Sequence, residues 1–158
     1  MQSKNWPSLL RRLPSYIKPT HYDIELFPDP VADISYGSET ITVDVQKRTR
    51  NIVLHAIADL TTINSDTIVV EQEGSPPVVT NSFYYDENRE QFFVIQLEQE
   101  LEIKEAHIYL EWQGPLVSTL VGINKVNYKD RIINKKKMGT INFWLFSIAQ
   151  VLCPAGSV

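Results

Sequence analysis

The sequence predicts an all-β fold, a twisted antiparallel sheet or sandwich of about seven or eight strands spanning roughly residues 14–128. Three observations support this prediction. Polar and apolar residues alternate with a period of two in several segments. Runs rich in β-branched and aromatic residues lie between these segments. Breaks containing proline or glycine separate the runs, and no stretch between residues 20 and 113 has a convincing amphipathic helix pattern.

Three segments alternate strictly enough to assign an inward face, namely His21–Leu26, Thr40–Val45 and His107–Trp112. In a strand, every second side chain points to the same side of the sheet. The expected inward residues are Tyr22, Ile24 and Leu26, then Ile41, Val43 and Val45, and finally Ile108, Leu110 and Trp112.

The remaining expected strands are less regular. Ile52–His55, Thr67–Val70 and Val78–Thr80 are short and β-branched, and the densely apolar Phe92–Leu97 is expected to be a central strand. Glu98–Glu105 is rich in helix formers but short, so we expect a loop or a short helical connection there.

Turn signals delimit these strands. Pro28-Asp29-Pro30 should end the first strand, because proline removes a hydrogen-bond donor and restricts its neighbour. Glu73–Pro77 interrupts the middle of the chain, Asp86–Arg89 has the composition of a hairpin tip, and Gly114-Pro115 should end the last clear strand.

Composition is ordinary for one globular domain, with 43% hydrophobic and 22% charged residues among 158. The net charge of -4 disfavours nucleic acid as a partner. The single cysteine, Cys153, cannot form an internal disulfide. No secretory signal and no apolar run long enough to span a membrane are visible, and the compartment stays open.

Both ends differ from this pattern. Residues 1–13 are expected to form a loose leader. Residues 1–123 hold 9 basic and 18 acidic residues, whereas residues 124–158 hold 6 basic residues and one acidic residue. Residues 129–158 are expected to be an irregular tail, first basic at Lys135–Lys137 and then apolar around Ile141–Cys153.

Five segments, in this order, resemble the N-terminal domain of aminopeptidase-N-type zinc metallopeptidases. The first segment contains a leucine-proline pair, then a proline-x-histidine-tyrosine motif, and then an alternating strand. The segments are Leu13–Leu26, Pro28-Asp29, Tyr36–Ile41, Ile52–Ala56 with Leu60, and Tyr109–Leu116. The resemblance covers roughly residues 13–128 and implies a saddle-shaped β domain that packs against a thermolysin-like catalytic domain.

The resemblance weakens at Leu120–Tyr128, where the family reads glycine-phenylalanine-tyrosine-arginine-serine-x-tyrosine and only Gly122 and Tyr128 match. The alanine-threonine-threonine-glutamine and proline-cysteine-phenylalanine-aspartate segments that follow in the family are not found, and Cys153-Pro154 is a reversed echo of the second. The tail from about Met138 is therefore interpreted as an alternative splice product, a frameshift or an incorrect gene model.

The chemistry of the family is missing from this sequence. It removes N-terminal residues of peptides with a zinc-bound water held by H-E-x-x-H on a helix. Neither that motif nor the glycine-x-methionine-x-asparagine element that anchors the amino terminus is present. We therefore expect no catalytic, cofactor-binding or metal-binding residue here, although zinc belongs to the full-length family.

Four further groups of residues could form functional sites, but each also has a structural interpretation. His21, His55 and His107 could form a metal site, or His107 with Glu105 or Glu111 an acid–base pair, but structural or solvated positions are favoured. Lys135–Lys137 could bind phosphate, RNA or lipid, and is interpreted as a solvated loop. Phe143–Leu152 could dock on a membrane or a partner, and is interpreted as core or misfolded. The aromatic residues that could form a ligand platform are interpreted as core, and they are Tyr22, Tyr36, Phe92, Phe93 and Trp112.

The prediction is a non-catalytic N-terminal β domain of a zinc-dependent aminopeptidase-like protein, present as a fragment or truncated isoform. Its expected partner is the catalytic domain of a longer product, and peptide substrates would be met only through the full enzyme. The alternative is a stand-alone β-sandwich module that binds another protein through a sheet face or edge.

Overall fold

The computed structural model describes residues 13–86, 92–116, 123–129 and 136–143. The described residues form strands and turns, and the strand bounds are β1 (Ile17–Asp29), β2 (Ile34–Val45), β3 (Thr49–His55), β4 (Thr62–Glu71), β5 (Thr80–Tyr85), β6 (Phe92–Leu101), β7 (Glu105–Pro115), β8 (Ile123–Lys129) and β9 (Lys136–Phe143). The expected all-β fold is confirmed.

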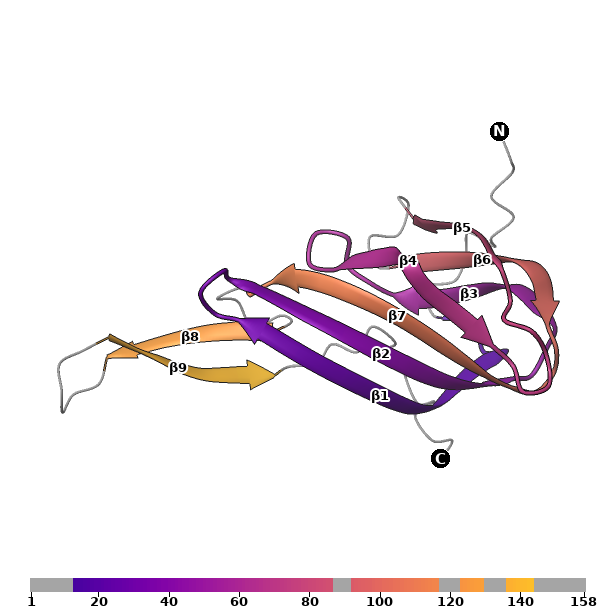
Figure 1. Cartoon of the computed structure of the whole chain (residues 1–158), viewed down its shortest axis with the longest axis horizontal. Coiled ribbons are helices and arrows are strands. Elements are labelled where there is room, and N and C mark those ends of the chain that lie inside the picture. The colour runs from indigo at the N-terminus through magenta and orange to yellow at the C-terminus, as the bar shows by residue number, and fades with distance from the viewer. Residues whose placement is uncertain (1–12, 87–91, 117–122, 130–135, 144–158) are drawn as a thin grey trace, which may run out of the picture.

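Two antiparallel sheets and one hairpin make up the fold (Figure 1). The larger sheet has the strand order β1-β2-β7-β4, and the smaller has the order β3-β6-β5. The strands β8 and β9 pair with each other at one end of the molecule (Figure 1). The expected central position of Phe92–Leu97 is confirmed, because β6 lies between β3 and β5.

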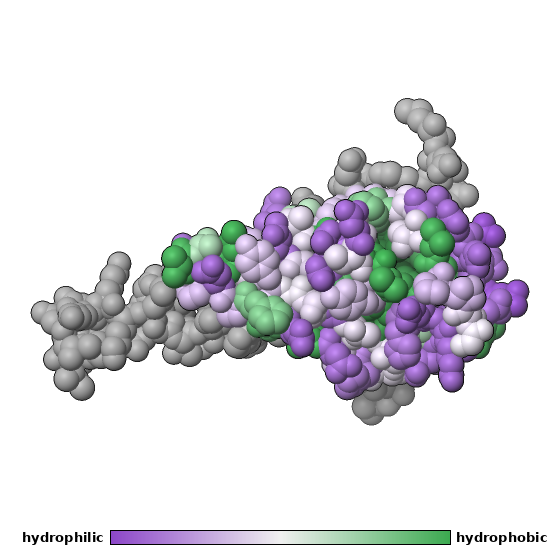
Figure 2. Space-filling view, in the orientation of Figure 1, coloured by the Kyte–Doolittle hydropathy of each residue, from purple (hydrophilic) through white to green (hydrophobic). Residues whose placement is uncertain are grey.

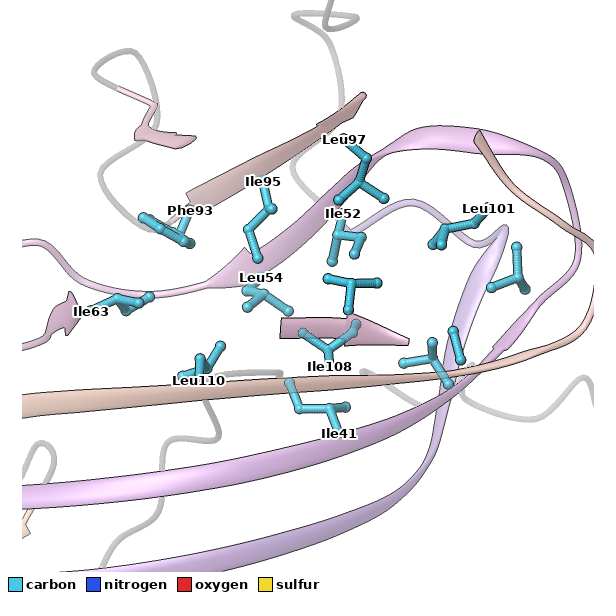
Figure 3. Packing of buried hydrophobic residues seen from close by; sticks show 14 of the residues in the cluster. Ile41, Ile52, Leu54, Ile63, Phe93, Ile95, Leu97, Leu101, Ile108 and Leu110 are labelled. Carbon is cyan, nitrogen blue, oxygen red and sulfur yellow. The ribbon is translucent and has the colours of Figure 1, made fainter. Parts of the chain in front are cut away.

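The hydrophobic core lies between the two sheets. Figure 3 shows Ile52, Leu54, Phe93 and Ile95 of the smaller sheet opposite side chains of the larger one, among them Ile41, Ile108 and Leu110. These residues occupy the alternate positions of their strands that the period of two assigns to one face. Burial of this apolar surface is the main source of stability in a domain with a single cysteine.

A smaller apolar cluster occupies the opposite face of the three-stranded sheet. Val53, Phe92 and Val94 are buried there, with Leu13 and Tyr84 packed against them. The strands β3 and β6 are therefore buried on both faces, which explains their near-continuous apolar runs. Of the expected leader, Leu13 alone is described, and residues 1–12 lie outside the described residues.

One expectation about local structure was wrong in part. The segment Glu98–Leu101 continues β6 instead of forming a loop or short helix, because Leu101 is fully buried in the core and pairs with Thr49. The connection to β7 is confined to residues 102–104. Within the expected C-terminal tail, residues 136–143 form β9, which pairs with β8.

A buried glutamine fixes the turn between β6 and β7. The Gln72 side chain donates to the carbonyl of Glu102 at 3.1 Å and accepts from the Glu102 backbone N–H at 2.9 Å. A carboxamide that both donates and accepts acts as a local substitute for strand pairing. The end of β4 is thereby attached to the turn that leads into β7.

A tyrosine connects the smaller sheet to the larger. The hydroxyl of Tyr85 on β5 donates to the carbonyl of Thr61 at 2.6 Å and accepts from the backbone N–H of Ile63 at 3.3 Å. The ring packs against Phe93 with centroids 5.0 Å apart. Burial raises the pKa of Tyr85, so its hydroxyl keeps its proton at neutral pH.

We expect Tyr85→Phe to lower the free energy of unfolding by about 1–2 kcal/mol, because the ring stays while two backbone groups lose their partner. Urea denaturation followed by circular dichroism measures this change. Tyr109→Phe is the matched control, since its hydroxyl bonds a half-buried side-chain carboxylate at the surface and no backbone group of the other sheet, and it should change stability by less than about 0.5 kcal/mol. Equal stability of both variants would contradict the inference that the Tyr85 hydroxyl stabilises the contact between the two sheets.

Candidate functional site

The face of the larger sheet that points away from the core, here called the outer face, carries polar and aromatic side chains in register. Strand pairing arranges these residues in rows that cross the sheet. Three of the rows are Phe27–Tyr36–Gln113–Thr62, Glu25–Ser38–Glu111–Asn64, and Asp23–Thr40–Tyr109–Val69. The outer face thus brings together residues that lie far apart in the sequence.

A groove of about 680 Å³ crosses the outer face. Its lining comes from all four strands and includes Glu25, Tyr36, Ser38 and Glu111. Figure 2 shows a face on which hydrophilic residues predominate among the described residues, with hydrophobic ones gathered in a few places. The groove itself is a mixed surface, because its lining combines the carboxylates of Glu25 and Glu111 with the rings of Phe27 and Tyr36.

The charged groups of the groove interact with a neighbouring phenol. The Tyr109 hydroxyl donates to Oε1 of Glu111 at 3.0 Å. This hydrogen bond to the carboxylate raises the pKa of Tyr109, while a hydrogen bond with Ser38 opposes the shift. Tyr109 therefore acts as a neutral donor that orients the Glu111 carboxylate.

The three histidines do not come together. His21 and His107 stand in one row of the outer face on either side of Thr42, whereas His55 lies on β3 in the other sheet. His55 instead packs against Phe92, with ring centroids 4.9 Å apart. Within the described ranges, no group of three or more His, Cys, Asp or Glu residues is arranged to hold a metal ion.

His107 has the acidic neighbour that an acid–base pair would need, and a hydroxyl neighbour as well. Its Nε2 lies 3.7 Å from Oε1 of Glu105, and its Nδ1 lies 3.2 Å from the Thr42 hydroxyl. Glu111 is instead engaged with Tyr109. Both His107 and Glu105 are solvent-exposed, so the arrangement matches the favoured solvated strand face.

The five aromatic residues considered as a platform have separate environments. Phe93 is fully buried in the core cluster, and Tyr22 and Trp112 are partly buried and pack against that cluster. Phe92 is buried in the smaller apolar cluster. Tyr36 lies on the outer face and is 44% exposed. Core packing is therefore right for four of the five residues and wrong for Tyr36.

Three buried polar groups on the inner face of the larger sheet have no hydrogen-bond partner. They are the Ser35 hydroxyl, Oε1 of Glu39 and the indole N–H of Trp112. Burial raises the pKa of Glu39 from its ordinary 4.5 to about 7. The alternation in Thr40–Val45, extended backwards by one residue, could have indicated that Glu39 faces inward.

The Trp112 ring is set by a glycine on the neighbouring strand. Gly37 pairs with Trp112, and a Cβ at Gly37 would lie 2.4 Å from the indole ring. Glycine is therefore required at this position for the ring to lie against the backbone of β2.

Several predicted features lie outside the described residues. These are Lys135, the apolar segment after Phe143 and Cys153. Lys136 and Lys137 begin β9 and pair with Lys129 and Tyr128 of β8. Across the described ranges, no helix is both long and apolar enough to cross a membrane.

Fold and surface together define an antiparallel two-sheet β domain with a mixed acidic and aromatic groove. The sequence matches the Peptidase M1 N-terminal domain over residues 18–142. The match extends past Leu120–Tyr128, the segment in which the resemblance of the individual motifs weakens. The chain therefore belongs to this family, as the resemblance implied.

Curated relatives carry aminopeptidase names. The chain is 31% identical over 134 residues to glutamyl aminopeptidase of Bos taurus, covering 82% of this chain and 13% of that protein. It is 30% identical over 118 residues to aminopeptidase M1-C of Oryza sativa subsp. japonica, covering 75% of this chain and 12% of the relative. The chain is thus short compared with these relatives and corresponds to their N-terminal domain.

Proposed function

We propose that this chain acts as a non-catalytic scaffold, the N-terminal β domain of a zinc-dependent aminopeptidase-like protein. The observation that supports the proposal most directly is the family match over residues 18–142, combined with alignments that cover 13% of the bovine relative. The domain would pack against a catalytic domain in a longer product, and would meet peptide substrates only there.

The histidines of this chain, all of which lie in the described residues, do not fit a zinc site. The sequence holds three histidines and no H-E-x-x-H motif. In the structure, His21 and His107 are separated by β2 and exposed, while His55 packs on an aromatic ring in the other sheet. In the proposed scaffold role, zinc is bound by a catalytic domain and not by these histidines.

The test is an assay of the purified chain. Zinc content would be measured by atomic emission, and turnover with amino-acyl p-nitroanilides, including the glutamyl and alanyl derivatives. We expect neither stoichiometric zinc nor hydrolysis above the buffer rate. Stoichiometric zinc together with chelator-sensitive hydrolysis would overturn the proposal.

A second measurement addresses the partner. The downstream reading frame of the transcript would be sequenced, and an in-frame H-E-x-x-H would support a catalytic domain on the same product. If the transcript encodes no such motif and the chain is a stable monomer, the stand-alone binding module replaces the scaffold. The groove on the outer face is the surface such a module would use.

A further inference from the structure

The groove has a small residue between two carboxylates at its centre. Ser38 on β2 pairs with Glu25 on β1 and with Glu111 on β7. Adjacent strands are about 4.8 Å apart, so the two glutamates stand about 10 Å from each other across Ser38. The Tyr109 hydroxyl hydrogen-bonds both Ser38 and Glu111, so it lies beside the serine between the two glutamates, and all four residues line the groove.

Aromatic rings border the same space. Tyr36 precedes Ser38 by two residues on the outer face of β2, and Phe27 pairs with Tyr36 from β1. Phe27 is 59% exposed, and both residues line the groove with Tyr109. Aromatic faces next to carboxylates suit a cation that is flat and weakly hydrated.

The carboxylates carry uncompensated charge. Among the described residues, no lysine or arginine forms an ion pair with Glu25 or Glu111; the arginine pairs are Arg48–Glu102 and Arg50–Glu100, both elsewhere. Glu111 uses Oε1 to accept from Tyr109, and within the described ranges no side-chain donor bonds its second carboxylate oxygen. Residues 1–123 as a whole hold 9 basic against 18 acidic residues.

We propose that this groove binds an arginine side chain presented by a polypeptide partner. The guanidinium lies beside the Tyr109 hydroxyl, donates to Glu25 on one side and to the second carboxylate oxygen of Glu111 on the other, and stacks on Tyr36. Arginine fits better than lysine because its planar fork can donate to two carboxylates at once. The proposal concerns the outer face alone, so it does not depend on the scaffold role.

The complementary charge and the shape of the groove identify the occupant. A single guanidinium can reach both glutamates from beside the Tyr109 hydroxyl, and the groove continues across β7 to Thr62 and Asn64 on β4, which leaves room for the peptide backbone beyond the side chain. Nucleic acid is disfavoured because its phosphates would meet two carboxylates. The occupant is therefore an arginine-bearing peptide segment.

The test uses the full chain, labelled with nitrogen-15, and three blocked tripeptides. Acetyl-Gly-Arg-Gly-amide is the probe, and the same peptide with lysine or with citrulline, the neutral isostere of arginine, is the comparison. We expect millimolar affinity in the order arginine, lysine, citrulline, with amide shifts centred on Glu25, Ser38 and Glu111. Raising the salt from about 50 to about 300 mM should weaken binding.

Variants give the matched control. Glu25→Gln with Glu111→Gln should lower the arginine affinity about tenfold, because two ion pairs at the surface are lost. Glu73→Gln with Glu98→Gln removes the same charge from exposed positions outside the groove, and should leave the affinity unchanged. Circular dichroism checks that each variant is folded. If the groove variant is unfolded, the positions of the amide shifts that the arginine peptide causes in the unaltered chain test whether it binds in the groove.

Several results would overturn the proposal. Equal binding of the citrulline peptide, shifts outside the groove, or equal weakening by both double variants would show that the carboxylates are not the receptor. Self-association of the unaltered chain in analytical ultracentrifugation, lost in the Glu25→Gln, Glu111→Gln variant, would assign the groove to a second copy instead.

Discussion

Replacing Glu39 with glutamine should stabilise this domain at alkaline pH by up to about 3 kcal/mol. Glu39 is 3% exposed, and its pKa is raised by burial from 4.5 to about 7. In the unfolded chain the group ionises near its ordinary pKa, so folding between these two values requires proton uptake. The folded state is therefore favoured by this group at low pH, and that contribution is lost as the pH rises to about 7.

Urea denaturation at about pH 4 and about pH 8 measures the effect. The unaltered chain should lose stability between these values through Glu39, while the Glu39→Gln variant should lose less, and the two should be similar at the acidic end. Glu98→Gln is the control because Glu98 is exposed, and it should leave the slope unchanged. The same slope in the Glu39→Gln variant as in the unaltered chain would show that the carboxyl is solvated.

Phe93→Ala should cost about 3–5 kcal/mol, a large share of the stability of a domain this size. Phe93 is 1% exposed near the start of β6 and packs against Tyr85 and Phe83, with centroids 5.0 and 6.0 Å away. The smaller side chain leaves a cavity that both sheets line, because neither can move without breaking strand pairing.

The matched control for this substitution is Phe83→Ala, on the neighbouring strand. Phe83 is 46% exposed, so its truncation removes less buried surface and should cost about 1 kcal/mol. Both variants would be compared by urea denaturation. A cost for Phe93→Ala no greater than for Phe83→Ala would mean that the space between the sheets is not closely packed.

Alternation predicted the strands of the larger sheet because each of them has one face on the core. Ile41, Val43 and Val45 are buried, as are Ile108 and Leu110, and the intervening residues are not. The inward residues of β1, among them Tyr22 and Ile24, are only partly buried, because this strand lies at the edge of its sheet. A periodic pattern specifies which side faces inward, but not how completely it is covered.

Where tertiary pairing outweighs local preference, the sequence was a poorer guide. Glu98–Leu101 has the composition of a helix, yet it continues β6 because Leu101 reaches the core. The strand Thr80–Tyr85 was recognised at its first residue only, because two polar residues and then three aromatic ones follow it and polar and apolar residues do not alternate.

The groove on the outer face could not be predicted, although its residues were visible. Glu25 and Glu111 both occupy outward positions of alternating strands. Their meeting across Ser38 depends on the register of β2 against β1 and β7, and a shift of one residue would place them elsewhere. Register between strands so far apart in the sequence is set by the packed core and not by any local signal.

The position of β2 between β1 and β7 also sets the order in which the chain can assemble. The β1–β2 hairpin is local in sequence. The pairing of β2 with β7, for example of Ile41 with Ile108, can form only after the four intervening strands have been synthesised. Until then one long edge of the hairpin has unpaired backbone groups that can capture a neighbouring strand. Closure of β2 on β7 is therefore the slow step we expect in folding, and the interval before it is when nascent chains are most prone to aggregate.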